Sequence, residues 1–399
     1  MGELNNNYKK TNLVLSLTLL ILGLVASISG MLSGLLLIDI GETFNVTIGY
    51  AGQINTFSSI ISIFFALLTS VFSVKYNHKT LLQAGLIAYI VSAAGCYLAP
   101  SFGAMMASFS LSGIGFALTT TMAFTLSAEL YPIDKRSAAI GLVFAGMSVS
   151  YIIGSMVVPF LQGIGGWRAS FLYYMLPSSI VALILATATI RRGIGTSNRS
   201  IEINLTEGYK NIFLTRSALF SLIGNLLAMA TWQGILTYNT SFFREWFQIS
   251  IAEASIFILI GSSLYTVGSI VSGRMVNRLG RKPLAAVSIM AASLFFMVYS
   301  YLPTFLISAT VVCLGWFLLG VRDTAATSLI IEQLPLYTGI MMSLNRAVTQ
   351  VGFSVGSGLG GMLLVFYDYK LMFVGLGVLG ILSAIVFQWL TLDPSTPTQ

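Results

Sequence analysis

Three ionisable residues, Arg322, Asp323 and Arg346, lie deep inside long apolar stretches of this sequence. Because a charged side chain is costly in an apolar environment, each is a candidate for a functional role. At 1.5 Å per helical residue, Asp323 lies roughly 13 Å from Glu332 along one helix. Arg346 lies roughly 12 Å from Thr338 along the next. An Asp323–Arg346 pair is therefore predicted, with Arg322 about 100° further round its helix and directed elsewhere.

Other polar side chains at similar depth are candidate contacts for a substrate. Aromatic rings beside amides suit an amphipathic organic molecule. Each residue alone could equally serve in helix–helix hydrogen bonds or as an anchor at the membrane interface. The candidates are Asn55, Asn225, Trp232, Gln233, Tyr265, Asn345 and Gln350.

The stretches that carry these residues are long enough to cross a membrane. Of 399 residues, 56% are hydrophobic and 8% are charged, whereas a soluble domain carries about a quarter charged residues. A membrane helix needs about 20 apolar residues, and an all-α integral membrane protein with twelve transmembrane helices is predicted. The predicted helices are 12–39, 51–74, 80–99, 102–128, 137–161, 170–190, 217–241, 253–275, 283–301, 304–331, 338–365 and 370–391.

Residues typical of metal or catalytic sites are scarce. The lone histidine, His78, lies in a predicted loop beside Lys75 and Lys79 and is expected to be solvated. Cys96 and Cys313 lie in apolar stretches, so neither a disulfide nor a metal site is implied. The sequence contains no Walker loop that would indicate ATP as the energy source. We predict no metal, no cofactor and no enzymatic activity.

Basic residues gather in alternate predicted loops. If the N-terminus lies inside, only Arg168, Arg244 and Lys370 fall in outer segments, and most other Lys and Arg fall in inner ones. This positive-inside bias predicts a multi-pass protein of the plasma membrane with both termini in the cytoplasm. Contacts with anionic headgroups of the lipid bilayer then account for the net charge of +7 without a nucleic-acid partner.

The chain also repeats itself after 203 residues. Lys79 matches Lys282 and Glu129 matches Glu332, and beyond one deletion the shift becomes 202. Two six-helix bundles in parallel orientation would place a substrate site between them, near the middle of the bilayer. The predicted bundles are 1–190 and 217–399, joined by a cytoplasmic linker at 191–216.

The central charges are not repeated in the first half. Thr119, Thr120 and Phe144 occupy the corresponding positions. This asymmetry favours a functional site that binds a proton, an anionic group of a substrate, or both in turn. The alternative is a buried pair that only holds two helices together. With all three residues ionised the net charge is +1, which favours an acidic or zwitterionic substrate.

Two loops carry a family resemblance. The sequence GRMVNRLGRK, from Gly273 to Lys282, resembles the signature G-x-x-x-D-R-x-G-R-K of the major facilitator superfamily, with Asn277 at the usual aspartate position. The equivalent first-half loop, SVFSVKYNHK, from Ser70 to Lys79, is a degraded copy. The resemblance implies the fold of that superfamily and secondary transport by alternating access.

These loops are predicted to form a cytoplasmic gate. A glycine at 273 would permit close helix packing. Ion pairs Lys75–Glu129 and Arg278–Glu332 would latch helix ends and break when the halves move. Alternatively, the cations only anchor the loops at lipid headgroups. The gate candidates are Gly273, Asn277, Arg278, Arg281, Lys282, Glu332, Lys75 and Glu129.

Together these features predict a monomeric secondary active transporter of a small organic solute, an antiporter or symporter coupled to a proton or another counter-ion. Asp323 is the candidate for proton coupling. Export of amphipathic compounds is the first expectation, and uptake or exchange of an organic anion is the alternative. A membrane sensor or enzyme on a transporter scaffold is an alternative of another class. The short soluble segments and the lack of a catalytic constellation argue against it.

Overall fold

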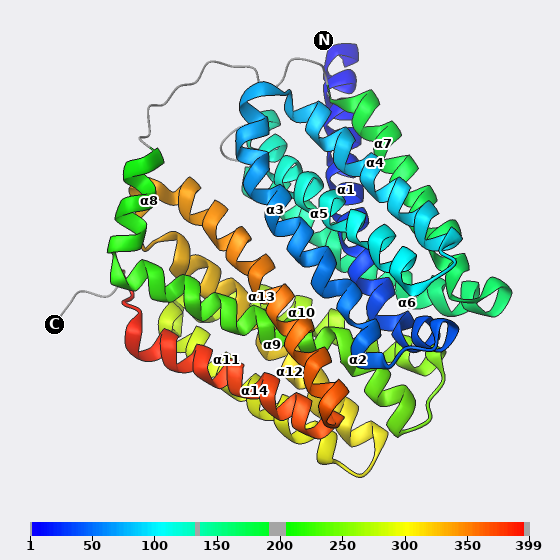
Figure 1. Cartoon of the computed structure of the whole chain (residues 1–399). Helices are drawn as coiled ribbons and strands as arrows, with labels where there is room; N and C mark the ends of the chain where they lie inside the picture. The colour runs from blue at the N-terminus through cyan, green and yellow to red at the C-terminus, as the bar shows by residue number, and fades with distance from the viewer. Residues whose placement is uncertain (1, 132–135, 191–204, 395–399) are drawn as a thin grey trace. The chain divides into compact units, whose positions relative to one another are not determined.

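The computed structural model describes residues 2–131, 136–190 and 205–394, and throughout these ranges the regular elements are helices (Figure 1). Eleven apolar helical stretches are long enough to cross a membrane. One of them spans 51 residues and is interrupted by non-helical backbone at Gly165 and Gly166, so it provides two crossings. The prediction of an all-α membrane protein with twelve crossings is confirmed.

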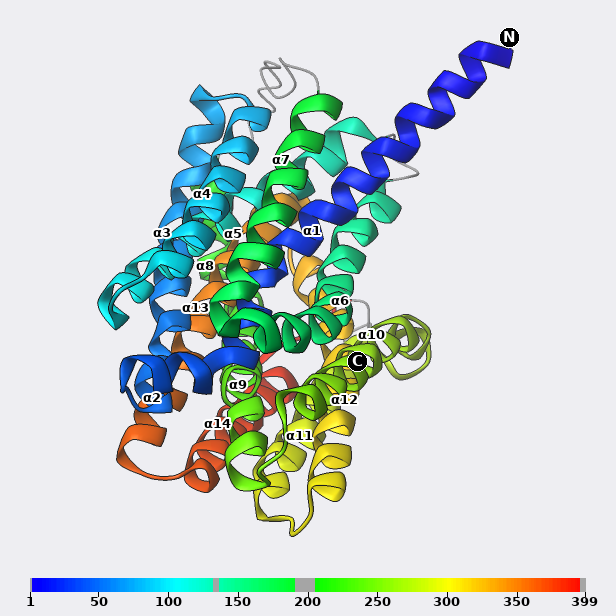
Figure 2. The same cartoon turned by 90° about the vertical axis from the view of Figure 1, so that its right-hand side faces the viewer.

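The first compact unit comprises residues 1–44 and 57–198. Its α1 continues well beyond the predicted segment, and its first turns project past the neighbouring helices of the unit (Figure 2). Within the unit α1 packs against α6, and α4 packs against α5 and α7. Its helices are α1 (Gly2–Phe44), α3 (Gln53–Lys75), α4 (His78–Leu98), α5 (Phe102–Leu130), α6 (Arg136–Ser170) and, after a π-helical turn at Phe171–Met175, α7 (Leu176–Thr189).

The second unit comprises residues 45–56 and 199–399. Here α12 packs against α10 and α11, α9 packs against α13 and α14, and α14 also packs against α11. The helices are α2 (Ile48–Ala51), α8 (Leu205–Leu214), α9 (Arg216–Trp246), α10 (Ile251–Leu279), α11 (Arg281–Val298), α12 (Phe305–Ile331), α13 (Thr338–Phe366) and α14 (Tyr369–Ile385), which continues as a π-helical turn at Val386–Leu390.

Two parts of the second unit were not expected from the sequence. Most of the predicted linker, 191–204, lies outside the described residues, but its last part forms the helix α8. The segment 45–56, which contains α2 and the first residues of α3, belongs to this unit, and its α2 packs on α13. The contact is close because a Cβ added at Gly49 would meet the carbonyl oxygen of Gly361 at 2.6 Å. Only glycine permits such a backbone approach.

Helix ends are set by polar side chains and one turn. Ser250 and Glu253 form a reciprocal capping box at the start of α10, and Asp368 accepts a hydrogen bond from the backbone of Leu371 at the start of α14 (2.8 Å). These side chains satisfy amides that a helix start leaves without partners. Gly280, with φ of +81°, separates α10 from α11, and this left-handed backbone favours glycine.

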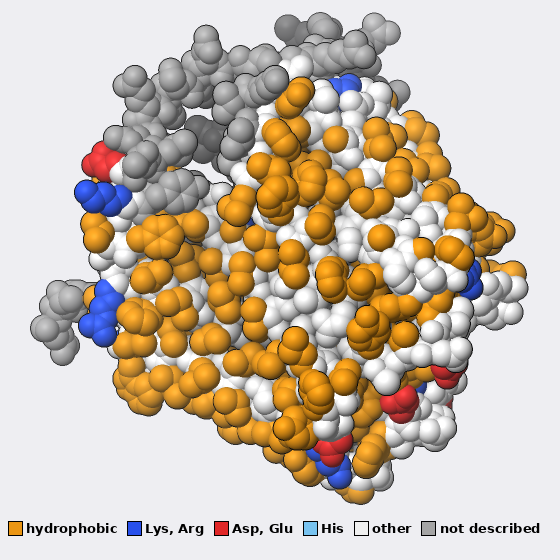
Figure 3. All heavy atoms as spheres, in the orientation of Figure 1, with side chains coloured by type: hydrophobic (Ala, Val, Ile, Leu, Met, Phe, Trp, Pro, Cys, Tyr) orange, Lys and Arg blue, Asp and Glu red, His pale blue; other side chains and the backbone are white. Residues whose placement is uncertain are grey.

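Hydrophobic side chains dominate the face of the molecule in Figure 3, whereas Lys, Arg, Asp and Glu appear mainly near its margins. Large apolar residues such as Leu306, Met362 and Trp389 are exposed on membrane-spanning helices. In water this surface would drive association. In a bilayer, lipid solvates it, so the surface fits a multi-pass membrane protein.

Candidate functional site

Asp323 of α12 lies at the centre of a polar cluster within the second unit. Its Oδ2 accepts a hydrogen bond from the hydroxyl of Tyr265 on α10 at 2.6 Å. Its Oδ1 accepts one from Nη1 of Arg322 at 2.7 Å. The side chain of Arg322 is 1% exposed and that of Asp323 is 21% exposed. Both oxygens of a partly accessible carboxylate are therefore engaged, one by a buried cation and one by a neutral donor.

The expectation that Arg322 would face away from Asp323 is wrong. The two residues are adjacent in α12, but the long arginine stem folds back so that the guanidinium reaches its neighbour. A buried guanidinium requires a counter-charge, and the Asp323 carboxylate supplies it. The plane of the guanidinium also lies near the ring of Phe387, with Cζ 5.3 Å from the ring centroid.

Arg346 of α13 belongs to the same neighbourhood. Its side chain is half-buried and interacts electrostatically with Tyr265. Three helices, α10, α12 and α13, thus bring ionisable or phenolic groups to one region, as the depth argument predicted. The direct Asp323–Arg346 pair itself stays a prediction.

An aromatic group joins this cluster through Tyr265. The ring of Trp232, on α9, stacks on Tyr265 with centroids 5.5 Å apart and an interplanar angle of 19°. Its other aromatic neighbour is Trp316 of α12, which it meets edge-on at 5.2 Å and 75°. Trp232 and Tyr265 were predicted substrate contacts. Trp316 was missed, although its spacing of two helical turns before Asp323 places both on one side of α12.

Two glycines allow α10 and α12 to approach closely at this point. A Cβ added at Gly320 would meet the carbonyl oxygen of Tyr265 at 2.0 Å, and one at Gly268 would meet that of Phe317 at 2.1 Å. The two backbones therefore touch at Tyr265 itself and one helical turn further along α10. Small residues that bring membrane helices into contact serve packing in general, and here they also fix the distance between a phenol and a carboxylate.

Some of the remaining predicted substrate-contact residues make hydrogen bonds within or between helices, and others are buried. Asn225 of α9 donates to Oδ1 of Asn345 at 2.7 Å and to Thr349 at 3.2 Å, so it ties α9 to α13. Gln233 donates to Thr237 of its own helix at 3.2 Å. Gln350 and Asn55 are buried. The amides of Asn225 and Asn345 thus have the alternative role of helix–helix hydrogen bonding.

The structure assigns Glu332 a different partner from the predicted one. Its carboxylate bonds to Arg281, whereas Arg278 is exposed. The reason is the turn at Gly280, which reverses the chain and directs the first residue of α11 toward the end of α12. The prediction of an Arg278–Glu332 pair is therefore wrong, and the partner of Glu332 is Arg281, three residues further along the chain.

The first unit has an equivalent pair that involves the lone histidine. His78 is the first residue of α4 and is 9% exposed, and its Nδ1 lies 3.1 Å from Glu129. The expectation of a solvated loop residue is wrong, because Glu129 at the end of α5 holds the imidazole. His78 and Arg281 are separated by 203 residues, so the two pairs occupy matched positions. The side chains of Lys75 and Asn277 lie outside the described residues.

Gly273, a gate candidate, and Lys79, a basic residue of the matched first-half loop, both differ from their interpretation. Gly273 has no described atom within 4 Å of an added Cβ, so the idea that it permits close packing is wrong. Lys79, beside His78, is buried and donates to the carbonyl oxygens of Thr187 (2.7 Å) and Ile190. A cation at carbonyl groups that end a helix is favourable, which makes Lys79 a cap for α7.

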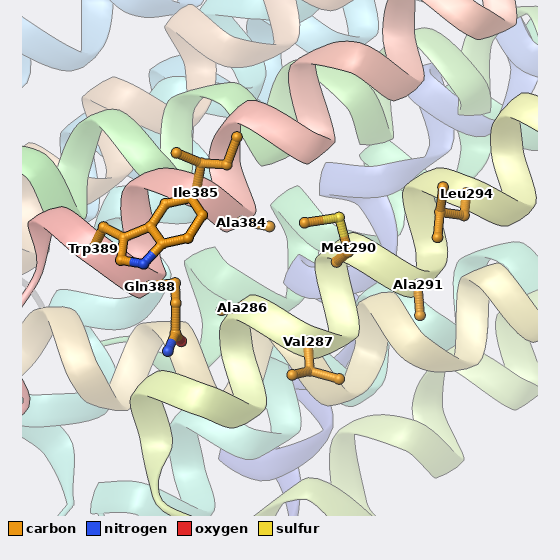
Figure 4. A pocket seen from close by; sticks show the side chains of 9 residues that line it. All are labelled: Ala286, Val287, Met290, Ala291, Leu294, Ala384, Ile385, Gln388 and Trp389. Carbon is orange, nitrogen blue, oxygen red and sulfur yellow. The ribbon is translucent and has the colours of Figure 1, made fainter.

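A cavity of about 310 Å³ opens between α11 and the end of α14 (Figure 4). Met290 and Leu294 line it from α11, and Gln388 and Trp389 line it from the π-helical turn. It contains none of the predicted site residues and no ionisable group. Val287 and Trp389 at its edge are largely exposed, so it lies on the surface that faces lipid.

The sequence profile described as the Major Facilitator Superfamily matches residues 18–321 and 221–399. The chain belongs to the major facilitator superfamily. Within the superfamily, an uncharacterised MFS-type transporter of Bacillus subtilis, YceJ, is 24% identical over 332 residues, 81% of this chain and 82% of its own length. A probable sugar efflux transporter of Pasteurella multocida is 31% identical over 176 residues, 42% of this chain and 40% of its own length.

A transcription regulatory protein of Pseudomonas aeruginosa, OpdE, is also similar, with 25% identity over 364 residues, 88% of this chain and 86% of its own length. Among solved structures, a D-xylose–proton symporter superposes with a TM-score of 0.79 at 15% identity and covers 97% of this chain and 99% of its own. This structural likeness shows the superfamily fold.

Proposed function

We propose that this superfamily member is a proton-coupled secondary transporter that exports amphipathic organic solutes by alternating access, with Asp323 as the proton carrier. The observation that supports this most is the carboxylate of Asp323. It lies inside a membrane-spanning helix, roughly 12 Å from the end of α12 by helical rise, and is held between Arg322 and Tyr265. Intramembrane carboxylates of this kind serve as proton relays in transporters.

The geometry suggests how proton and solute could exclude each other. When Asp323 is ionised, it neutralises Arg322, which donates to Oδ1. Its Oδ2 can then accept a hydrogen bond from another donor in place of the hydroxyl of Tyr265. A cationic group of an amphipathic solute could take that place while its apolar part lies on the Trp232–Tyr265 rings. Proton uptake removes the negative charge, leaves Arg322 as an uncompensated cation, and so expels a cationic solute. Competition for one carboxylate is sufficient for exchange of proton against solute.

The similarity to a probable sugar efflux transporter supports export. We propose a monomer in the plasma membrane with both termini in the cytoplasm. Single cysteines test this orientation: Gly103 precedes most of α5 and Lys210 lies in α8, and both positions are exposed. With an impermeant thiol reagent on intact cells, Gly103→Cys should be labelled and Lys210→Cys should not. The reverse pattern would exclude this orientation.

The pairs His78–Glu129 and Arg281–Glu332 are proposed as latches within each unit. Each joins the start of one helix to the end of another, so each would keep a helix pair together while the bundle moves as a body. This differs from an anchor at lipid headgroups, for which the cation would face lipid and not a carboxylate.

Transport of an organic anion is the second candidate. Arg322 and Asp323 neutralise each other, so Arg346 supplies the net positive charge of the region. An anionic solute would bind there. A sensor is the candidate of another class, favoured by the similarity to a transcription regulatory protein. Movement of solute by the purified protein distinguishes a transporter from a sensor.

The experiment begins with a thermal-shift screen of solutes, because a ligand of the folded state raises the unfolding temperature. A hit is then followed in proteoliposomes with an imposed proton gradient. Wild type should accumulate the solute against its gradient, and Asp323→Asn, which lacks the carboxylate for which proton and solute compete, should not. Thr120→Ser, at the matched position of the first half, is the control and should accumulate like wild type. Accumulation by Asp323→Asn would exclude Asp323 as the proton carrier.

A further inference from the structure

We propose that Tyr265 is a positioning residue that transmits the protonation state of Asp323 to the indole of Trp232. The inference rests on the proposed function, in which Asp323 gains and loses the proton. Tyr265 is the residue that touches both groups. Its hydroxyl donates to the carboxylate at 2.6 Å, and the face of its ring stacks on Trp232 at 5.5 Å.

The hydroxyl end of Tyr265 responds to the proton because of the chemistry of its acceptor. A hydrogen bond to an ionised carboxylate is shorter and roughly twice as strong as one between neutral groups. When Asp323 binds a proton, its negative charge disappears and the carboxyl group itself becomes a donor. Oδ1 is held by Arg322, so Oδ2, which faces Tyr265, is the oxygen free to take the proton. The charge-assisted bond to Tyr265 is then lost.

The ring of Tyr265 converts that loss into a movement at Trp232. The phenol group is rigid, so a shift of its hydroxyl also moves the ring face that stacks on Trp232. Trp232 and Tyr265 are only half-buried and have room to respond. Trp316, which meets Trp232 edge-on, is 2% exposed and packs against Gly261, where an added Cβ would lie 2.5 Å from its ring. Trp316 is therefore held more tightly than Trp232 and Tyr265.

Few other groups could produce the same response. Arg322 of α12 and Arg346 of α13 are the charged neighbours of this pair, and arginine stays protonated in proteins. From α11, the sequence between Pro283 and Val298 carries no ionisable residue, and on α9 the residues nearest Trp232 are neutral, with Tyr238 the nearest titratable side chain. A change at Trp232 near neutral or acidic pH therefore reports Asp323.

The test uses tryptophan fluorescence of the full chain in lipid nanodiscs, without any solute, titrated between pH 4.5 and 8.5. Wild type should show a pH-dependent change in emission that is lost in Trp232→Phe and in Asp323→Asn, which assigns it to these two residues. In Tyr265→Phe, which keeps the stacked ring and removes only the hydroxyl, the change should also be lost. Trp389→Phe removes an exposed indole far along the chain and should keep the change.

The proposal would be overturned if the emission of Tyr265→Phe changed with pH at the same midpoint and with the same amplitude as that of wild type. It would also be overturned if the emission of wild type did not change with pH. Gly320→Ala, which separates α10 from α12 but keeps every functional group, provides a second variant and should reduce the amplitude. Failure here is distinct from failure of the proposed function. If Asp323→Asn abolishes accumulation while Tyr265→Phe titrates like wild type, Asp323 remains the carrier and only the role of Tyr265 is excluded.

Discussion

The two halves of this chain share a scaffold but differ in their centres. Where the second half has Arg322 and Asp323, the first has Thr119 and Thr120. The hydroxyl of Thr120 donates to Phe116 of its own helix at 2.6 Å, whereas Asp323 binds a residue on another helix. By the same shift of 203 residues, Ser62 stands where Tyr265 stacks on Trp232. The first half therefore resembles the second in its helices and lacks its chemistry.

At the helix ends the relation is the opposite. His78–Glu129 and Arg281–Glu332 join matched positions in the two halves. Features that both halves need, such as the connection of neighbouring helix ends, are repeated, whereas the charged cluster occurs once. This difference is what we expect if the pairs at the helix ends are structural and the central cluster carries the proposed function.

The largest expected effect follows from removing the cation of the central cluster. Arg322→Met leaves the Asp323 carboxylate without its counter-charge, and breaking a buried pair in this way costs about 3–5 kcal/mol. Thermal unfolding in detergent should show a strong loss of stability. Arg322→Met combined with Asp323→Asn should recover most of it, because no uncompensated charge remains.

The matched change in the first half is Thr119→Val. The hydroxyl of Thr119 is buried and has no hydrogen-bond partner within the described part of the chain, so replacing it by a methyl group is expected to be nearly neutral. A loss as large as that of Arg322→Met would contradict the functional contrast between the two centres.

The next effect concerns the contact between α10 and α12. Gly320→Ala places a methyl group where the carbonyl of Tyr265 lies 2.0 Å away, and overpacking of this kind costs about 1–3 kcal/mol. It should also lower proton-driven accumulation, since the Tyr265–Asp323 distance depends on this approach. Gly273→Ala, in the signature loop, is the control, because no described atom lies within 4 Å of the added carbon. Equal losses in both variants would argue against a special role for Gly320.

The smallest effects are expected at the paired helix ends. The carboxylates of Glu129 and Glu332 are 32% and 42% exposed, and ion pairs this accessible contribute about 0–1 kcal/mol. Glu129→Gln and Glu332→Gln should each lower the unfolding temperature by a similar, small amount. A loss as large as that of Arg322→Met in either variant would contradict this minor contribution.

His78→Arg sharpens this last comparison. With arginine in both halves, Glu129→Gln and Glu332→Gln should lower the unfolding temperature equally. A clearly larger loss in the first half would show that Glu129 supports more than its contact with residue 78.

The sequence predicted much of the fold because membrane helices are defined by length and apolarity. The ends of α10 to α13 lie within four residues of the predicted ones, and those of α9 and α14 differ by up to six. The predicted crossings 137–161 and 170–190 form one long helical stretch, which the kink at Gly165 divides. The helix α8 was not predicted, because its mixture of polar and apolar residues resembles a linker.

Part of the predicted set of residues lies together, but the pairing differs from the prediction. Tyr265 bonds to Asp323 and stacks on Trp232, and Arg346 interacts with Tyr265. Their roles in transport stay predictions. The pairing of Arg322 with Asp323 could not be read from helical angles, because a long side chain can fold back onto the next residue. Likewise, the turn at Gly280 moved the partner of Glu332 from Arg278 to Arg281, and sequence spacing alone does not reveal its direction.

The central claim, that Asp323 carries the proton, is tested most directly by following protons. Proteoliposomes with a pH-sensitive dye inside are given an outward gradient of the solute found by thermal shift, with no proton gradient imposed. In wild type, solute movement should drive protons the other way and change the internal pH. In Asp323→Asn the internal pH should stay constant, and Thr120→Ser should behave like wild type. A pH change of wild-type size in Asp323→Asn would contradict the account.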